Sequence, residues 1–82
     1  MIIDFKFNGH SFNNPTDSEH LQFQADTRRR IETALEIIKD KISDSTTGSV
    51  TIEYSNFVRY DKIHVNGFGM ETVNVLMALE GF

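Results

Sequence analysis

The longest run of helical periodicity in the chain extends from Asp26 to Ser43. Its apolar residues recur at steps of four, three and four, at Ile31, Leu35, Ile38 and Ile42. At about 100° per residue these positions form one narrow stripe, which is typical of an amphipathic helix that packs on a sheet. Turn-forming residues follow Ser43, and they predict that the helix ends near that residue.

Two signals compete for the start of this helix. The segment Thr16-Asp17-Ser18-Glu19 has the pattern of a capping box, which would begin the helix at Asp17. If the helix began there, the residues in line with the apolar stripe would be polar and would face the core, namely His20, Gln24 and Thr27. We therefore predict an extended segment over 20–24 and a helix that begins at Asp26 or Thr27.

Residues 2–7 alternate between apolar and polar side chains, which predicts a half-buried strand. Asn8-Gly9 follows, and this dipeptide favours a type I′ turn because both of its residues tolerate a positive φ. A hairpin closed on this turn pairs Phe7 with His10. We expect its second strand to stop at Phe12, before a loop rich in turn formers.

The C-terminal half predicts a three-stranded antiparallel meander. A hairpin that opposes Ile52 to Tyr60 also opposes Glu53 to Arg59, so that apolar and charged pairs match on both faces. A second type I′ turn at Asn66-Gly67 then leads to a strand over 72–80. The helix is expected to cover the sheet face formed by Val50, Ile52, Tyr54, Val58, Tyr60, Val73, Val75 and Met77.

The predicted fold class is α+β, with a short N-terminal β-hairpin, one amphipathic helix and a C-terminal meander that the helix covers on one face. The 82 residues are expected to form a single domain, 1–82. A chain of this length lies just above the roughly 70 to 80 residues at which one core becomes sufficient for a stable fold. No internal repeat, linker or low-complexity tract divides the sequence.

The composition excludes several classes of protein. The chain has no cysteine, which excludes a disulfide framework and thiolate metal sites. Its net charge of −4 disfavours nucleic acid as the main partner. No run approaches the roughly 18 apolar residues of a membrane span, and the N-terminus lacks the features of a signal peptide. We therefore expect a soluble, cytoplasmic protein that does not contact a membrane.

Three consecutive arginines form the first candidate site, Arg28, Arg29 and Arg30. In a helix that begins at Asp26 or Thr27 they occupy the first turn, where cations oppose the helix dipole. Free backbone N–H groups and guanidinium groups together suit a phosphate, a carboxylate or a nucleic-acid backbone. The alternative is a solvated face on which these arginines pair with acidic residues four positions away.

An apolar surface on the sheet face opposite the helix forms the second candidate site. The predicted register places largely on that face Phe57, Ile63, Val65, Phe68, Met70, Leu76 and Phe82. Exposed apolar patches often mark association surfaces, so we expect a homodimer or another protein partner. The alternative is that the N-terminal hairpin folds over this face and buries it within the monomer.

The sequence contains no motif for catalysis or cofactor binding. His10, His20 and His64 lack the spacing of metal ligands, and no serine or glycine pattern matches a nucleophile or dinucleotide motif. We therefore predict no catalytic residue, no metal site and no cofactor. The leading hypothesis is a small non-enzymatic interaction or adaptor module that self-associates through its sheet. The second is a nucleic-acid- or phosphate-associated regulatory protein that uses the three arginines at a helix N-terminus.

Overall fold

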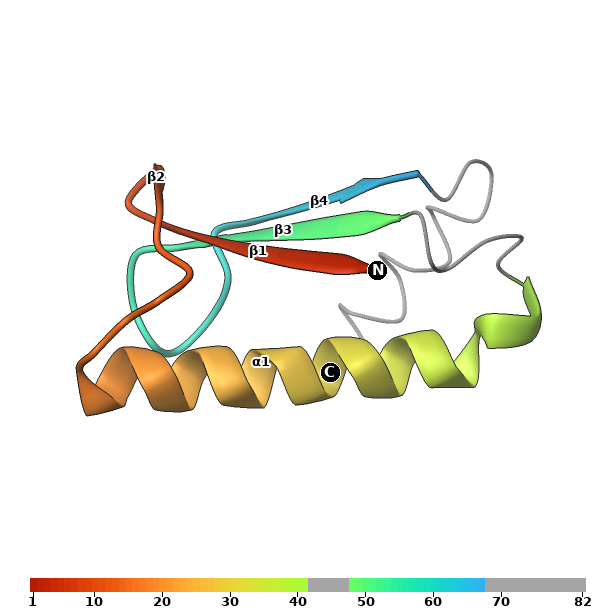
Figure 1. The fold of residues 1–82 in the computed structure, drawn as a ribbon, viewed down its shortest axis with the longest axis horizontal. Helices are drawn as coiled ribbons and strands as arrows, with labels where there is room; N and C mark the ends of the chain where they lie inside the picture. The colour runs from red at the N-terminus through yellow and green to blue at the C-terminus, as the bar shows by residue number, and fades with distance from the viewer. Residues whose placement is uncertain (42–47, 68–82) are drawn as a thin grey trace.

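The structure, a computed structural model, describes residues 1–41 and 48–67. In this part of the chain, helix α1 (Ser18–Ile37) lies along one face of a four-stranded sheet and is followed by the 3-10 turn η1 (Lys39–Lys41) (Figure 1). The strands are β1 (Ile2–Phe7), β2 (His10–Ser11), β3 (Ser49–Tyr54) and β4 (Lys62–Asn66). The predicted α+β class is confirmed.

The sheet is mixed, and the prediction of a purely antiparallel arrangement is wrong. Its order is β2-β1-β3-β4, and β1 runs parallel to β3, whereas the two outer pairs are antiparallel. Two parallel neighbours need a long crossover between them, and α1 lies within that connection. The N-terminal hairpin is therefore part of the main sheet and does not fold over its second face.

The predicted N-terminal hairpin is confirmed. Asn8 and Gly9 have φ values of 52° and 84°, and Phe7 pairs with His10. The backbone N–H of Phe12 also donates to the carbonyl of Phe5, at 2.8 Å. The Asn8-Gly9 dipeptide thus sets the register of the hairpin through positive φ angles, as its sequence indicated.

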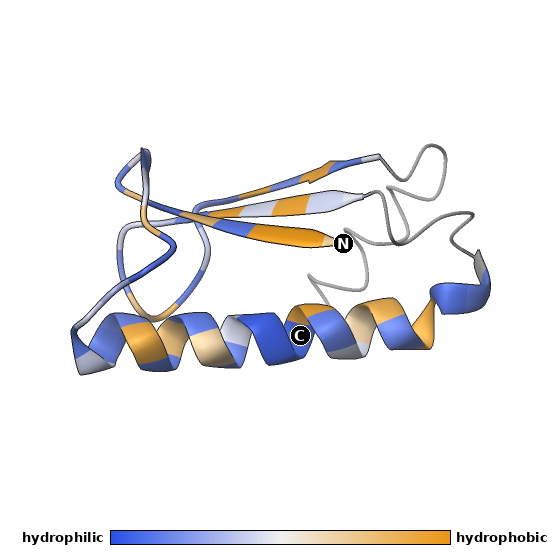
Figure 2. Cartoon of the chain, viewed as in Figure 1, coloured by the Kyte–Doolittle hydropathy of each residue, from blue (hydrophilic) through white to orange (hydrophobic). Residues whose placement is uncertain are grey.

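The core lies between α1 and the strands β1 and β3. Val50, Ile52 and Tyr54 are buried on the face that α1 covers, as predicted. The C-terminal half of α1 supplies apolar side chains to the same cluster, and Figure 2 shows the apolar positions along the helix and the strands. The buried cluster consists of Phe5, Phe23, Ile31, Ala34, Leu35, Ile38, Val50, Ile52 and Tyr54.

The predicted register between β3 and the following strand is wrong. Glu53 pairs with Lys62 and Ile52 with Ile63, so that residues 55–61 form a loop between β3 and β4. The Asn56 carboxamide oxygen accepts hydrogen bonds from the backbone N–H groups of Val58 and Arg59, at 2.9 and 3.3 Å, so these two residues belong to a turn where we expected the next strand to begin. The observed register also opposes Glu53 to a cation, so charge matching could not separate the two registers.

The prediction of a second type I′ turn, which requires a positive φ at both Asn66 and Gly67, is wrong for Asn66. Gly67 has a φ of 85°, but Asn66 is the last residue of β4 and does not have a positive φ. The strand predicted over 72–80 lies outside the described residues.

The predicted start of the helix at Asp26 or Thr27 is wrong, because α1 begins at Ser18 and includes residues 20–24. Asp17 is the N-cap residue, and its carboxylate accepts a hydrogen bond from the backbone N–H of His20, at 3.2 Å. The capping signal was therefore the correct one. The α-helix also ends earlier than expected, at Ile37, whereas Ser43 lies outside the described residues.

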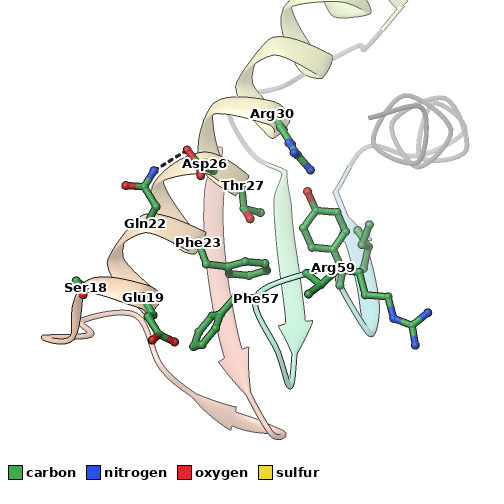
Figure 3. Close-up of a pocket in the computed structure, with 12 residues that line it drawn as sticks. Ser18, Glu19, Gln22, Phe23, Asp26, Thr27, Arg30, Phe57 and Arg59 are labelled. Carbon is green, nitrogen blue, oxygen red and sulfur yellow. Dashed lines mark hydrogen bonds between the residues drawn. The ribbon is translucent and has the colours of Figure 1, made fainter.

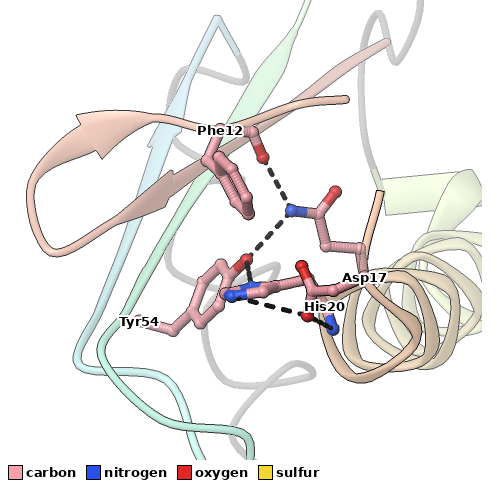
Figure 4. A network of polar contacts seen from close by, with 5 residues as sticks. Phe12, Asp17, His20 and Tyr54 are labelled. Atoms are coloured by element: carbon pink, nitrogen blue, oxygen red, sulfur yellow. Dashed lines mark hydrogen bonds and ion pairs between the residues drawn. The ribbon is translucent and has the colours of Figure 1, made fainter. Parts of the chain in front are cut away.

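A buried set of hydrogen bonds explains why polar residues can face the core in the first half of α1. The Tyr54 hydroxyl lies 2.8 Å from Nδ1 of His20 and accepts a hydrogen bond from the Gln24 amide at 3.0 Å (Figure 4). The same Gln24 amide nitrogen donates to the carbonyl of Phe12 at 2.7 Å, and Nε2 of His20 lies 3.9 Å from the Asp17 carboxylate. We call these five residues the Tyr54 network.

The Tyr54 network meets the hydrogen-bonding needs of the side chains that it buries. Within the described residues, no buried side-chain nitrogen or oxygen lacks a hydrogen-bond partner. The His20 ring also packs among aromatic rings in T-shaped contacts, with centroids 4.5 Å from Phe7, 4.7 Å from Phe12 and 4.9 Å from Phe57. A buried polar group costs stability only when its hydrogen bonds are lost, so these polar residues serve as core residues.

We expect Gln24→Ala to lower the free energy of unfolding by about 1–3 kcal/mol, because the substitution leaves the Phe12 carbonyl without its side-chain donor and removes one of the two hydrogen bonds of the Tyr54 hydroxyl. Urea unfolding followed by circular dichroism measures the change. The matched control is Gln22→Ala, whose amide bonds only the exposed carboxylate of Asp26, and which should cost less than about 0.5 kcal/mol. Equal losses from the two substitutions would contradict the Tyr54 network.

The network also predicts a pH dependence at alkaline pH. Burial raises the pKa of the Tyr54 hydroxyl above its ordinary value of 10.0. Above that pH the unfolded chain releases a proton that the folded protein retains, so stability falls as pH rises. The stability advantage of wild type over Tyr54→Phe should therefore be full below pH 10.0 and shrink above it. Urea unfolding of both proteins across this range tests the prediction, and a constant difference would refute it.

Candidate functional site

An open groove of about 750 Å³ lies between the first half of α1 and the loop 55–61 (Figure 3). We call it the α1–loop groove. Its wall on α1 is formed by Ser18, Glu19, Gln22, Phe23, Asp26, Thr27 and Arg30. Its opposite wall is formed by Phe57, Val58, Arg59, Tyr60 and Ile63.

The wall on α1 exists because the helix begins at Ser18. Residues three and four positions apart share one face of a helix, and the series Glu19, Gln22, Phe23, Asp26 and Arg30 follows this spacing. Had the helix begun at Asp26, most of this wall would have been extended chain. The Tyr54 network holds the same half of α1 against the sheet, so the network also positions the groove.

The opposite wall is a loop that descends from the sheet toward α1 (Figure 1). The turn at Asn56 presents Phe57 and Val58 at the end of this loop. The Phe57 ring lies 4.9 Å from the His20 ring and 6.3 Å from the Phe23 ring, so it packs on the buried face of α1. Tyr60 closes the floor from the other side, with its ring 6.2 Å from that of Phe23.

Two apolar side chains of the groove are exposed to solvent. Val58 is 87% exposed and Phe57 is 41% exposed. These two residues are adjacent in the loop, where the backbone N–H of Val58 donates to the Asn56 side chain. Large apolar side chains that gather at a concave surface are typical of binding sites.

The charged residues of the groove are unevenly compensated. The Asp26 carboxylate bonds the Arg29 guanidinium at 2.7 Å and the Gln22 amide at 3.0 Å, so its charge is already balanced. Arg30 and Arg59 form no ion pair with any carboxylate among residues 1–41 and 48–67. Glu19, which also lines the groove, is in no ion pair among the same residues, so unpaired charges of both signs lie around its apolar floor.

The three predicted anion-binding arginines do not converge on one site. The Arg28 guanidinium stacks over the Phe5 ring with 5.1 Å between the guanidinium carbon and the ring centroid, Arg29 pairs with Asp26, and Arg30 lines the groove. Consecutive helical residues point about 100° apart, so this divergence follows from their adjacency. All three lie within α1 and not in its first turn, so the expected placement at a helix N-terminus is wrong.

The predicted association surface is also placed differently. Ile63 and Val65 pack against the core on the face that α1 covers, so the expectation that they point away from the helix is wrong. Phe57 lines the groove. The other four residues lie outside the described part of the chain, namely Phe68, Met70, Leu76 and Phe82.

Sequence reasoning missed Val58 and Tyr60 as groove residues, because it assigned both to a strand in the core. The sequence predicts a connection around residues 55–57 with a strand that resumes at Val58, and no local pattern indicates that the loop is longer. Because the loop continues to Asp61, Val58 and Tyr60 lie in it and not in the sheet.

The histidines are distributed over separate parts of the fold. His10 is exposed on β2, His20 belongs to the Tyr54 network, and Nε2 of His64 lies 2.8 Å from the Glu53 carboxylate. Among residues 1–41 and 48–67, no three histidine, aspartate or glutamate side chains gather in a way that could hold a metal ion.

In the same residues, no helix combines the length and apolar character that crossing a bilayer requires.

No protein-family model, curated protein or solved structure matches this chain. The functional argument therefore rests on the geometry of the groove and on the chemistry of the residues that line it.

Proposed function

We propose that the protein is a small non-enzymatic interaction module that binds an apolar peptide segment of a partner protein in the α1–loop groove. The exposed pair Phe57 and Val58 carries this proposal. Val58 is almost fully exposed, and Phe57 is partly exposed although its ring contacts Phe23 of the buried cluster. Apolar side chains that gather at a concave surface, as these two do, are typical of association sites.

The dimensions of the groove fit a peptide segment. Its volume of about 750 Å³ lies within the range of roughly 300–1,000 Å³ that is usual for ligand sites. The apolar floor of Phe23, Phe57 and Ile63 offers a site for one or two side chains, and the polar wall on α1 can position the rest of the segment. A partner would gain affinity mainly by covering Phe57 and Val58, because burial of apolar surface is the largest favourable contribution to most associations.

Self-association through the sheet stays a prediction. Its proposed surface has lost Ile63 and Val65, which face the core, so a second copy would have to use other residues. The face of the sheet opposite α1 carries mainly polar side chains in the described strands, Asp4, Lys6, Thr51, Glu53, Lys62 and His64. For this reason the groove is the better supported surface.

Selection of short random peptides displayed on phage tests this function. We expect recovered peptides to contain apolar side chains, and Val58→Glu to weaken their binding at least about tenfold, because it places a charge where the partner's apolar surface must pack. Fluorescence anisotropy with the synthesised peptides measures the affinities.

The matched control is Ile37→Glu, since Ile37 is a β-branched residue that is 69% exposed on α1 and does not line the groove. This variant should bind the peptides as wild type does. The proposal would be contradicted if no recovered peptide bound Val58→Glu more weakly than wild type. Concentration-dependent dimerisation of wild type in sedimentation, lost in Val58→Glu, would instead identify a second copy as the occupant of the groove.

A further inference from the structure

One buried polar residue of α1 is not explained by the Tyr54 network. Three polar side chains of the helix are buried, namely His20, Gln24 and Thr27. The network supplies hydrogen bonds to the first two, whereas Thr27 takes no part in it. Thr27 is 2% exposed, and it is the most deeply buried polar residue among those that line the α1–loop groove. It therefore lies at the bottom of the groove and not at its rim.

The hydroxyl group of Thr27 has no hydrogen-bond partner among residues 1–41 and 48–67. A threonine within a helix can bond the carbonyl four residues earlier, and Thr33 does so with the carbonyl of Arg29 at 2.8 Å. In the same part of the chain, every side-chain nitrogen or oxygen that is closed to solvent has a partner. The unpaired hydroxyl of Thr27 is therefore accessible, and the groove that this residue lines is its opening to solvent (Figure 3).

The α1 wall offers few other hydrogen-bonding groups at this depth. Residues three and four positions apart share one face of a helix, so Thr27 lies between Phe23 and Arg30 (Figure 3). The backbone groups in this part of α1 bond within the helix and are not available to a ligand. The Gln22 amide already bonds the Asp26 carboxylate at 3.0 Å. Thr27 is thus the buried residue of this wall whose polar group can still form a hydrogen bond.

We infer that Thr27 is a specificity-determining residue of the groove, and that its hydroxyl group bonds a backbone amide of the bound peptide segment. This inference rests on the proposed function and adds to it a polar contact beneath the apolar side chains. A segment that packs an apolar side chain on Phe23 brings its backbone to the same turn of α1. A peptide group that is shut off from water there is unfavourable unless it is hydrogen-bonded. A hydroxyl can donate to the carbonyl or accept from the N–H, so it suits either half of the amide.

Thr27→Val tests the inference, because valine has nearly the shape of threonine and lacks the hydroxyl. We expect the recovered peptides to bind this variant about tenfold more weakly than wild type in fluorescence anisotropy. The urea midpoint of unfolding should not fall, because the hydroxyl has no hydrogen bond to lose in the free protein. A residue that only supports the fold would give the opposite result, with a lower midpoint and unchanged affinity of the folded protein.

Two further variants serve as controls. Thr27→Ser keeps the hydroxyl group and should bind the peptides within about threefold of wild type. Thr33→Val makes the same change at an exposed position of α1 outside the groove, and it should leave the affinity unchanged. Binding of the peptides to Thr27→Val with the affinity of wild type would overturn the inference.

A scan of the peptide backbone identifies the group that Thr27 bonds. Each amide of one recovered peptide is replaced in turn by an ester, which lacks the N–H donor and has a weaker acceptor carbonyl. At one position the ester should bind wild type about tenfold more weakly than the amide does. Against Thr27→Val the same two peptides should differ by less than about twofold, because their common partner is gone. Absence of such a position would overturn the inference.

The outcomes also separate this inference from the proposed function. Peptides that depend on Val58 but bind Thr27→Val as tightly as wild type would overturn the role of Thr27 and leave the proposed function standing. Peptides that do not depend on Val58 would contradict both.

Discussion

The hydroxyl group of Tyr54 is the contact on which the arrangement of the protein depends. It joins β3 to His20 and Gln24 of α1, and Gln24 continues the connection to the carbonyl of Phe12 beyond the hairpin. These bonds allow polar residues to replace apolar ones in the first half of the helix. Without these hydrogen bonds the burial of His20 and Gln24 would cost several kcal/mol. That cost would oppose packing of the first half of α1 on the sheet.

The groove is a consequence of that same contact. Tyr54 fixes the first half of α1 on one side, and the turn at Asn56 fixes the loop on the other. Packing of Phe57 against His20 and Phe23 then joins the two walls through aromatic contacts. The groove is thus built on the polar part of the core, and the apolar half of the helix serves to stabilise the fold.

The elements that the sequence predicted correctly are those set by local chemistry. The Asn8-Gly9 hairpin needs only two residues with positive φ, and the buried face of β3 follows from simple alternation. The start of α1 could not be derived from its apolar stripe, because the reason for burying His20 is a hydroxyl group 34 positions later in the chain. The parallel pairing of β1 with β3 is likewise a long-range contact, and no local pattern separates it from a free hairpin.

The site was harder to predict than the fold. The arginines were conspicuous as a run, but adjacency on a helix disperses them, and only Arg30 reaches the groove. Val58 and Arg59 line the groove because the observed register leaves them in the loop, where the Asn56 side chain bonds their backbone N–H groups. Charge and alternation described the correct and the incorrect register equally well, so the decisive information was the geometry of the turn.

Amide hydrogen exchange resolved along α1 tests the central claim most directly, namely that the Tyr54 network extends the helix to Ser18. The backbone N–H of Leu21 donates to the Asp17 carbonyl at 3.1 Å, so helical bonding begins at the first turn. We expect protection from exchange to begin within residues 21–24 and to continue without a break to Leu35. Protection that begins only after Asp26, with rapid exchange at Gln24, would contradict the account.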